Sequence, residues 1–270
     1  MRRKVWIAAF LVSVVLGIAY VFSLFLWTDP KTGFATAGGT GVRYLAMLLP
    51  VLLAVASGAM VPSDRRFFEK KQTGALLAAV AVSSEIYGVG LILAVLSGSQ
   101  APASSHHMTI GRALMGDLAE LLLAVLFLLF GLWALLLVLK KRVGNSDEML
   151  YLGVAGSAAF FLHTVLCFLV RPASLHRIPP AVEILAALAA LLFVTAYLRA
   201  YYLPERPGCI RAVCRSGLIA FFFCTCLFLP QTVWQAVCGV SSLEDVLLAI
   251  TLGLTGCWGA AVSVKTLENE

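Results

Sequence analysis

The carboxylate of Glu85 interrupts a long apolar stretch, and its chemistry needs an explanation. It lies in "AVSSEIYGVG", residues 81–90, and apolar residues continue on both sides. A charged side chain at the centre of a bilayer costs roughly 2.5–3.5 kcal/mol on insertion scales, so Glu85 should face protein or water. Its helical neighbours include Ala78, Ala81 and Gly88, and small residues let another helix approach closely. We therefore predict that Glu85 lies on a packing face.

His163 is the group whose depth best matches that of Glu85. If both spans run in the same direction, Glu85 lies about 11 residues and His163 about 13 residues in, which is roughly 17 and 20 Å of helix. A glutamate–histidine pair in a low-dielectric site can exchange a proton near neutral pH, as proton-coupled transport requires. The alternative is structural: a protonated glutamate and a neutral histidine, each bonded to a neighbouring helix.

Hydroxyl groups at similar depth extend this pair into a predicted polar layer. They belong to Ser84, Tyr87, Thr164, Thr225 and Thr255. Together with Glu85 and His163 they form our candidate site for a proton, a cation or a small substrate. The sequence predicts no catalytic residue, no metal site and no cofactor.

A second group of ionisable residues falls near the expected outer ends of the spans: His106, His107, His176, Asp117, Glu120 and Glu183. Imidazole and carboxylate groups together suit transition metals. These residues are scattered along the chain, however, and the two adjacent histidines do not share a helix face. We interpret them as solvated loop residues and as acids at helix starts, where they complement the helix dipole.

The seven cysteines do not form the pattern of a disulfide framework or a zinc site. Cys167 and Cys238 fall near the outer ends of their spans and could meet. The remaining thiols are interpreted as small, buried and inert. They are Cys209 and Cys214 in an expected cytoplasmic loop, and Cys224, Cys226 and Cys257 within spans.

The elements that must position these residues are membrane-spanning helices. The chain is 61% hydrophobic and only 13% charged, and its apolar residues come in long uncharged blocks. About 20 apolar residues span a bilayer as a helix. We predict an all-α polytopic transmembrane bundle of about eight spans, near residues 5–27, 44–61, 74–97, 118–139, 149–170, 184–202, 214–230 and 246–264. Seven spans are the main alternative, because residues 217–229 are short alone.

Basic residues alternate between the two sides of this arrangement. Fifteen lysines and arginines fall on one side and five on the other. Because basic residues accumulate on the cytoplasmic side, both termini should be cytoplasmic. The net charge of +6 is therefore interpreted as a topology signal and not as a nucleic-acid surface. The first span is too long for a typical signal peptide and is expected to be retained.

The chain is expected to form one membrane domain over residues 1–270. A weak internal echo relates "VPSDR" at 61–65 to "LPERP" at 203–207. It suggests a four-plus-four repeat of residues 1–140 and 147–265, as transporters often have. Chance similarity between two basic loops containing proline is the alternative.

No phosphate-binding loop, nucleophile elbow or HExxH motif occurs, which removes the main reason to predict an enzyme. The favoured hypothesis is transport of a small solute or ion, coupled to protons through Glu85. The alternative is a non-catalytic membrane subunit or sensor that works through a partner protein or as a homo-oligomer. An intramembrane enzyme acting on lipid is the third. The expected location is the cell membrane, and specifically the cytoplasmic membrane of a bacterium.

Overall fold

The fold is built from long apolar helices, whose backbone groups are satisfied within each segment as a bilayer requires. The computed structural model describes residues 2–29, 32–36, 39–61, 74–97, 110–139, 147–170, 177–203 and 208–268. The helices are α1 (Arg2–Trp27), α2 (Thr40–Ala59), α3 (Gly74–Ser97), α4 (Ile110–Leu139), α5 (Asp147–Val170), α6 (Ile178–Tyr202), α7 (Cys209–Ala220), η1 (Phe221–Phe228), α8 (Leu229–Val237) and α9 (Leu243–Glu268). In these ranges strand pairing is limited to isolated bridges.

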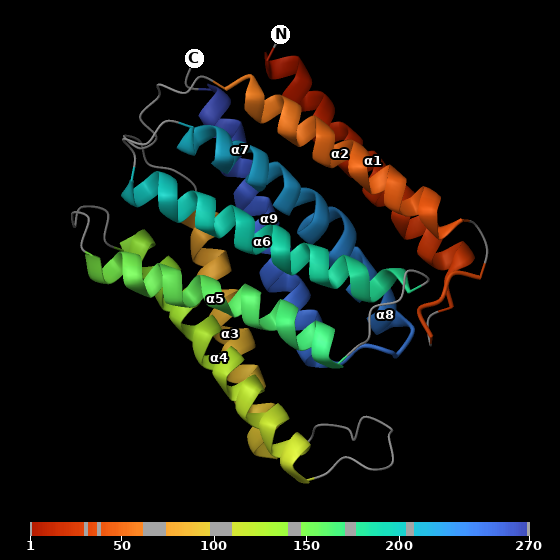
Figure 1. The fold of residues 1–270 in the computed structure, drawn as a ribbon, viewed down its shortest axis with the longest axis vertical. Coiled ribbons are helices and arrows are strands. Elements are labelled where there is room, and N and C mark those ends of the chain that lie inside the picture. The colour runs from red at the N-terminus through yellow and green to blue at the C-terminus, as the bar shows by residue number, and fades with distance from the viewer. Residues whose placement is uncertain are drawn as a thin grey trace.

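Eight helical segments are long and apolar enough to cross a membrane. They indicate a multi-pass membrane protein, and they confirm the predicted all-α bundle with eight spans. The two termini lie at the same end of the bundle, as an even number of spans requires (Figure 1). We call the opposite end, which carries Thr32, Arg177 and Ser241, the distal end. The cytoplasmic orientation of the termini stays a prediction.

The seventh span passes through Pro230 without ending, and it is longer than the predicted 214–230. It runs over residues 209–237 as α7, η1 and α8. Proline has no N–H, and its ring would clash with the carbonyl four residues earlier in an α-helix. The chain widens here into a π-helix, and the Leu229 N–H donates to the Cys224 carbonyl, five residues earlier. The wider turn accommodates the proline, which explains why eight spans form and not seven.

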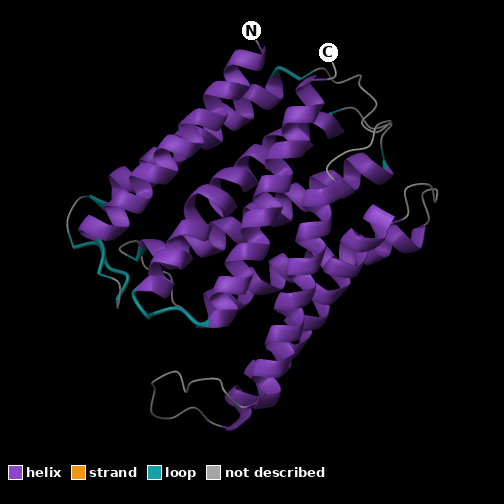
Figure 2. Ribbon diagram, turned by 180° about the vertical axis from the view of Figure 1, so that it is seen from behind, coloured by secondary structure: helices purple, strands orange, loops and turns teal. Residues whose placement is uncertain are grey.

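The second half of the chain supplies the centre of the bundle. In the most apolar stretches of α6, α7–α8 and α9, 61–67% of residues are buried, against 22–28% in α1 and α2. The α1–α2 pair covers one side of the centre and the α3–α4 pair the other (Figures 1 and 2). At the centre α7 and α9 cross at Gly217 and Gly259, where a Cβ on Gly217 would lie 2.5 Å from the Gly259 carbonyl oxygen. The two backbones can approach this closely only because both residues lack a side chain.

Candidate functional site

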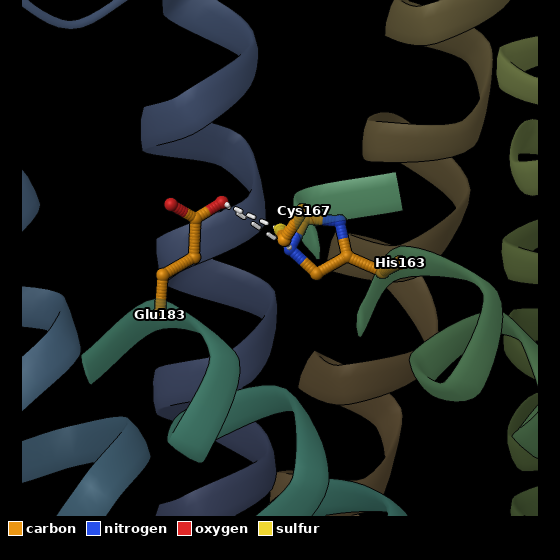
Figure 3. Close-up of side chains that lie close together, drawn as sticks. All are labelled: His163, Cys167 and Glu183. Carbon is orange, nitrogen blue, oxygen red and sulfur yellow. Dashed lines mark hydrogen bonds and ion pairs between the residues drawn. The ribbon is translucent and has the colours of Figure 1, made fainter. Parts of the chain in front are cut away.

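Three side chains able to carry charge converge in the interior between α5 and α6 (Figure 3). The Nε2 atom of His163 lies 3.4 Å from Oε1 of Glu183. The Sγ atom of Cys167 lies 3.4 Å from each of those two atoms. The three residues are 8%, 9% and 8% exposed, in chain order. We call His163, Cys167 and Glu183 the buried cluster.

The local sequence explains why these three residues meet. His163 and Cys167 are four residues apart, so they project from the same face of α5. The helices α5 and α6 are consecutive neighbours. His163 lies seven residues before α5 ends, and Glu183 lies five residues after α6 begins. The two side chains are therefore at nearly equal distances from the connection between the helices.

The electrostatics of the buried cluster require a positive charge or protons. The Cys167 thiol donates to the Glu183 carboxylate, and His163 forms an ion pair with it only when the imidazole is protonated. A thiolate and a carboxylate together would bring two negative charges into a low-dielectric interior. Such burial is very costly unless each charge is paired or bound to a cation. The buried cluster is therefore a place where a cation can be held.

A cavity of about 150 Å³ lies at the distal end, and Glu183 is the member of the buried cluster that lines it. Thr32 lies at its exposed edge, and Glu183 is its most deeply buried acidic residue. The polar side chains along it belong to Thr32, Arg177, Glu183, Thr232, Gln235, Ser241 and Asp245. Glu183 thus belongs both to the cavity wall and to the buried cluster, and it connects the two.

Tyr87 is the second of the sequence-predicted residues that lies near the buried cluster. Its ring, from α3, packs edge-on against Phe127 at 4.8 Å between centroids. Its buried hydroxyl has Glu183, Cys167, Asp245 and Glu120 as electrostatic neighbours. Groups of α4, α5, α6 and α9 therefore interact electrostatically with one phenol of α3.

Glu85 lies elsewhere, in the seam between α3 and α4. A Cβ built on Gly131 would lie 2.7 Å from the Glu85 Oε1 atom, so the carboxyl sits directly over that glycine. This agrees with a packing face, but the side chain is only partly buried. In the described part of the chain it makes no hydrogen bond or ion pair.

The structure does not form the suggested pair of Glu85 with His163, because α4 packs between α3 and α5. On the α5 side, a Cβ on Gly156 would lie 2.6 Å from the Phe130 Cα atom. On the α3 side, Glu85 meets Gly131, the next residue of α4. His163 turns instead toward α6 and pairs with Glu183. The similar depth of the two residues in the membrane suggested that they pair, but α4 separates their helices.

The hydroxyls of the predicted polar layer serve their own helices or the neighbouring one. Ser84, Thr164 and Thr255 each donate to the carbonyl four residues earlier, at 2.8 Å. Thr225 donates to the Gly253 carbonyl of α9 at 2.8 Å. These bonds satisfy polar groups in an apolar interior. They do not join the four residues into one network, and whether any of them takes part in function stays a prediction.

The outer residues interpreted as solvated or as helix-start acids fall into three groups. His106, His107 and His176 lie outside the described residues. Asp117 and Glu120 lie in α4, beyond its first turn, where Asp117 is exposed and Glu120 is half-buried. Glu183, interpreted as a helix-start acid, is instead a buried member of the cluster. Its place five residues into α6 is beyond the first turn, where an acid would complement the helix dipole.

All seven cysteines are free. Cys167 therefore does not pair with Cys238, which is exposed. Cys224 is a buried thiol that donates to the Ala186 carbonyl at 3.2 Å, as expected of an inert packing residue. Among the cysteines, all of which are described, Cys167 combines burial with imidazole and carboxylate contacts, and these contacts were not predicted from the sequence.

Gln231 is a further buried polar residue, and it was not predicted from the sequence. It is 1% exposed, accepts from the Tyr20 hydroxyl at 2.5 Å and donates to the Pro179 carbonyl at 3.0 Å. It thereby ties α8 to α1 and to the start of α6, beside the cavity. The one signal for it was an amide following Pro230 inside an apolar block.

Aromatic side chains fill the interior between the buried cluster and the termini. Consecutive ring centroids lie 4.6–6.3 Å apart. All but one of the rings are fully buried. We call these residues the aromatic column: Phe127, Phe130, Trp133, Phe160, Phe193, Tyr197 and Trp258. Rings at these separations pack favourably and leave little space for water.

No family model, curated protein or solved structure matches this chain. The function is therefore inferred from the geometry of the buried cluster and its cavity. The signal that could have identified the buried cluster is the pattern His163-x3-Cys167 near the end of one span, followed by Glu183 near the start of the next. It becomes informative only once the two helices are known to pack together.

Proposed function

We propose that this chain transports a small cation across the membrane and that the buried cluster is the binding site for the cation. The observation that carries the proposal is the position of Glu183. It forms part of the wall of a cavity from the distal end and also contacts His163 and Cys167. An intramembrane ionisable group facing an accessible cavity is what a cation pathway requires.

The aromatic column supports this proposal from the other side. A transporter must be open to one side at a time, so the route beyond its binding station should be closed. Between the buried cluster and the termini the interior is filled by the fully buried rings of Phe130, Trp133 and Phe160. The bundle thus has the form expected of a state open toward the distal end and closed toward the termini.

Flux through reconstituted protein tests the proposal. The full chain is placed in sealed liposomes that contain either a trapped pH indicator or a trapped indicator for divalent metal ions, and a gradient is imposed. We expect flux of protons or of a divalent ion above the protein-free level. Glu183→Gln, which keeps the shape of the side chain and removes its charge, should reduce that flux to the protein-free level.

Glu244→Gln is the matched control, because Glu244 lies in the first turn of α9 and not among the cavity residues. It should carry the wild-type flux. Wild-type liposomes without either flux would overturn the proposal, and so would a Glu183→Gln variant with undiminished flux.

A membrane subunit or sensor that works through a partner is the second candidate, and Glu85 is the observation that favours it. Its carboxyl is partly exposed on α3 beside Val82 and Ile86, which are 54% and 51% exposed. A carboxyl at this depth is costly in lipid, so a partner helix with a polar or basic group would stabilise it. Cross-linking from the introduced thiol of a Glu85→Cys variant to a second membrane protein, in cells where flux is absent, would favour this candidate.

A further inference from the structure

We propose that the buried cluster is a binding site for one divalent transition-metal ion and that Zn²⁺ is the ion which fits it best. The inference rests on the proposed function, since it uses the same three residues, and it deepens that function by naming the ion. Four observations carry it: the donor atoms, their separations, their charges and the open side of the site.

The donor atoms are a nitrogen, a sulfur and an oxygen. Zn²⁺ is bound in proteins by imidazole nitrogen, thiolate sulfur and carboxylate oxygen. Magnesium and calcium ions take oxygen ligands, so a site built on Cys167 and His163 excludes them on chemical grounds. The mixed set in the cluster suits an ion of intermediate softness.

The separations match those of ligands around one tetrahedral ion. With metal bonds of about 2.0–2.1 Å to nitrogen and oxygen and about 2.3 Å to sulfur, tetrahedral geometry requires an N–O separation of roughly 3.4 Å and S–N and S–O separations of roughly 3.6 Å. The corresponding separations are 3.4 Å for all three pairs. Each of the three separations is therefore within about 0.2 Å of the tetrahedral value.

The charges also balance. A neutral imidazole, a thiolate and a carboxylate carry two negative charges, and a divalent ion cancels both. On binding, the ion replaces the proton of the Cys167 thiol, and that proton leaves through the cavity to solvent. The ion thereby offsets the cost of placing a thiolate beside a carboxylate in a buried site.

Three protein ligands leave one tetrahedral position for water or for exchange. Structural zinc sites are closed by four protein ligands, whereas catalytic zinc sites keep one position open for water or substrate. The cavity reaches Glu183, so the open position has a route to the distal end past Asp245 and Ser241. Such a site can bind and release an ion, as a binding site on a transport pathway must.

Metal binding by the purified full chain in detergent tests the proposal without any flux. Metal-stripped protein is titrated with Zn²⁺, and the bound metal is measured after dialysis. We expect about one Zn²⁺ per chain. His163→Ala, Cys167→Ser and Glu183→Gln should each weaken binding by more than the roughly 10–100-fold that loss of an outer-shell partner costs. Excess Mg²⁺ or Ca²⁺ should not compete.

Two controls separate loss of a ligand from loss of folding. Cys238→Ser changes an exposed thiol and should bind like the wild type. Cys167→Ser should reduce the affinity for Cd²⁺ by a larger factor than the affinity for Zn²⁺, because cadmium binding depends more strongly on the soft sulfur ligand. A misfolded variant would lose both ions alike and would also elute as aggregate.

The possible results distinguish failure of the proposed metal site from failure of the proposed transport function. Wild-type protein that binds no Zn²⁺ at millimolar concentration overturns the metal site, as does equal Zn²⁺ binding by all three variants. If protons still cross liposomes in that case, the proposed transport function survives without the metal. Zn²⁺ binding that depends on the three residues supports the metal site, and when no flux accompanies it, only the transport function fails.

Discussion

The distal half of the interior and the half nearest the termini are built from the same helices but from different chemistry. Near the distal end, α5 and α6 contribute His163, Cys167 and Glu183 beside a cavity. Toward the termini, the same two helices contribute Phe160, Phe193 and Tyr197 to the aromatic column. One turn of α5 separates Phe160 from His163.

The comparison assigns binding to one half and stability to the other. Ionisable groups in an apolar interior are costly and are by default candidates for a functional site. Fully buried rings contribute packing that no ligand can replace. If this division is right, substitutions in the aromatic column should affect stability, and substitutions in the buried cluster should affect binding.

The largest expected effect on stability comes from shortening a ring of the aromatic column. Phe160 is 0% exposed and its neighbour Phe161 is 59% exposed. Phe160→Ala should lower the free energy of unfolding by roughly 3–5 kcal/mol, since it leaves a cavity between Phe127 and Phe130. Phe161→Ala is the matched control and should change little. Denaturant titration of both variants measures the difference, and equal losses would break the proposed division.

A smaller effect is expected at the boundary of the cavity. Tyr20→Phe removes the hydroxyl that donates to Gln231 and leaves a buried amide oxygen without that donor. The cost should be about 1–3 kcal/mol. Tyr151→Phe serves as control, because Tyr151 is 71% exposed. Thermal unfolding of the two variants checks this, and an unchanged midpoint for Tyr20→Phe would mean that the bridge does not tie α1 to α8.

The smallest effect is expected at Glu85. Glu85→Gln should change both the unfolding free energy and Zn²⁺ affinity by less than about 0.5 kcal/mol, because the side chain is partly exposed and lies away from the buried cluster. The same samples used for Zn²⁺ titration serve for this measurement. Abolished proton flux in this variant would move the functional site from the distal half to the seam of α3 and α4.

The spans could be predicted because lipid imposes a length and a polarity on each segment. All eight predicted spans occur, although α2 begins at Thr40 and α6 at Ile178, some residues earlier than predicted. The partners of a buried residue could not be predicted in this way. Similar depth suggested that His163 meets Glu85. In the structure α4 packs between α3 and α5, and His163 contacts Glu183 instead. The rotation of each helix against its neighbours depends on contacts far apart in the sequence.

X-ray absorption at the zinc edge of the loaded, full-length protein tests the central claim most directly, because it reports the atoms bound to the ion. The buried cluster predicts one sulfur at about 2.3 Å and nitrogen or oxygen ligands at about 2.0–2.1 Å, with the sulfur lost in Cys167→Ser. A shell of nitrogen and oxygen alone, or one with two or more sulfurs that persists in Cys167→Ser, would contradict it.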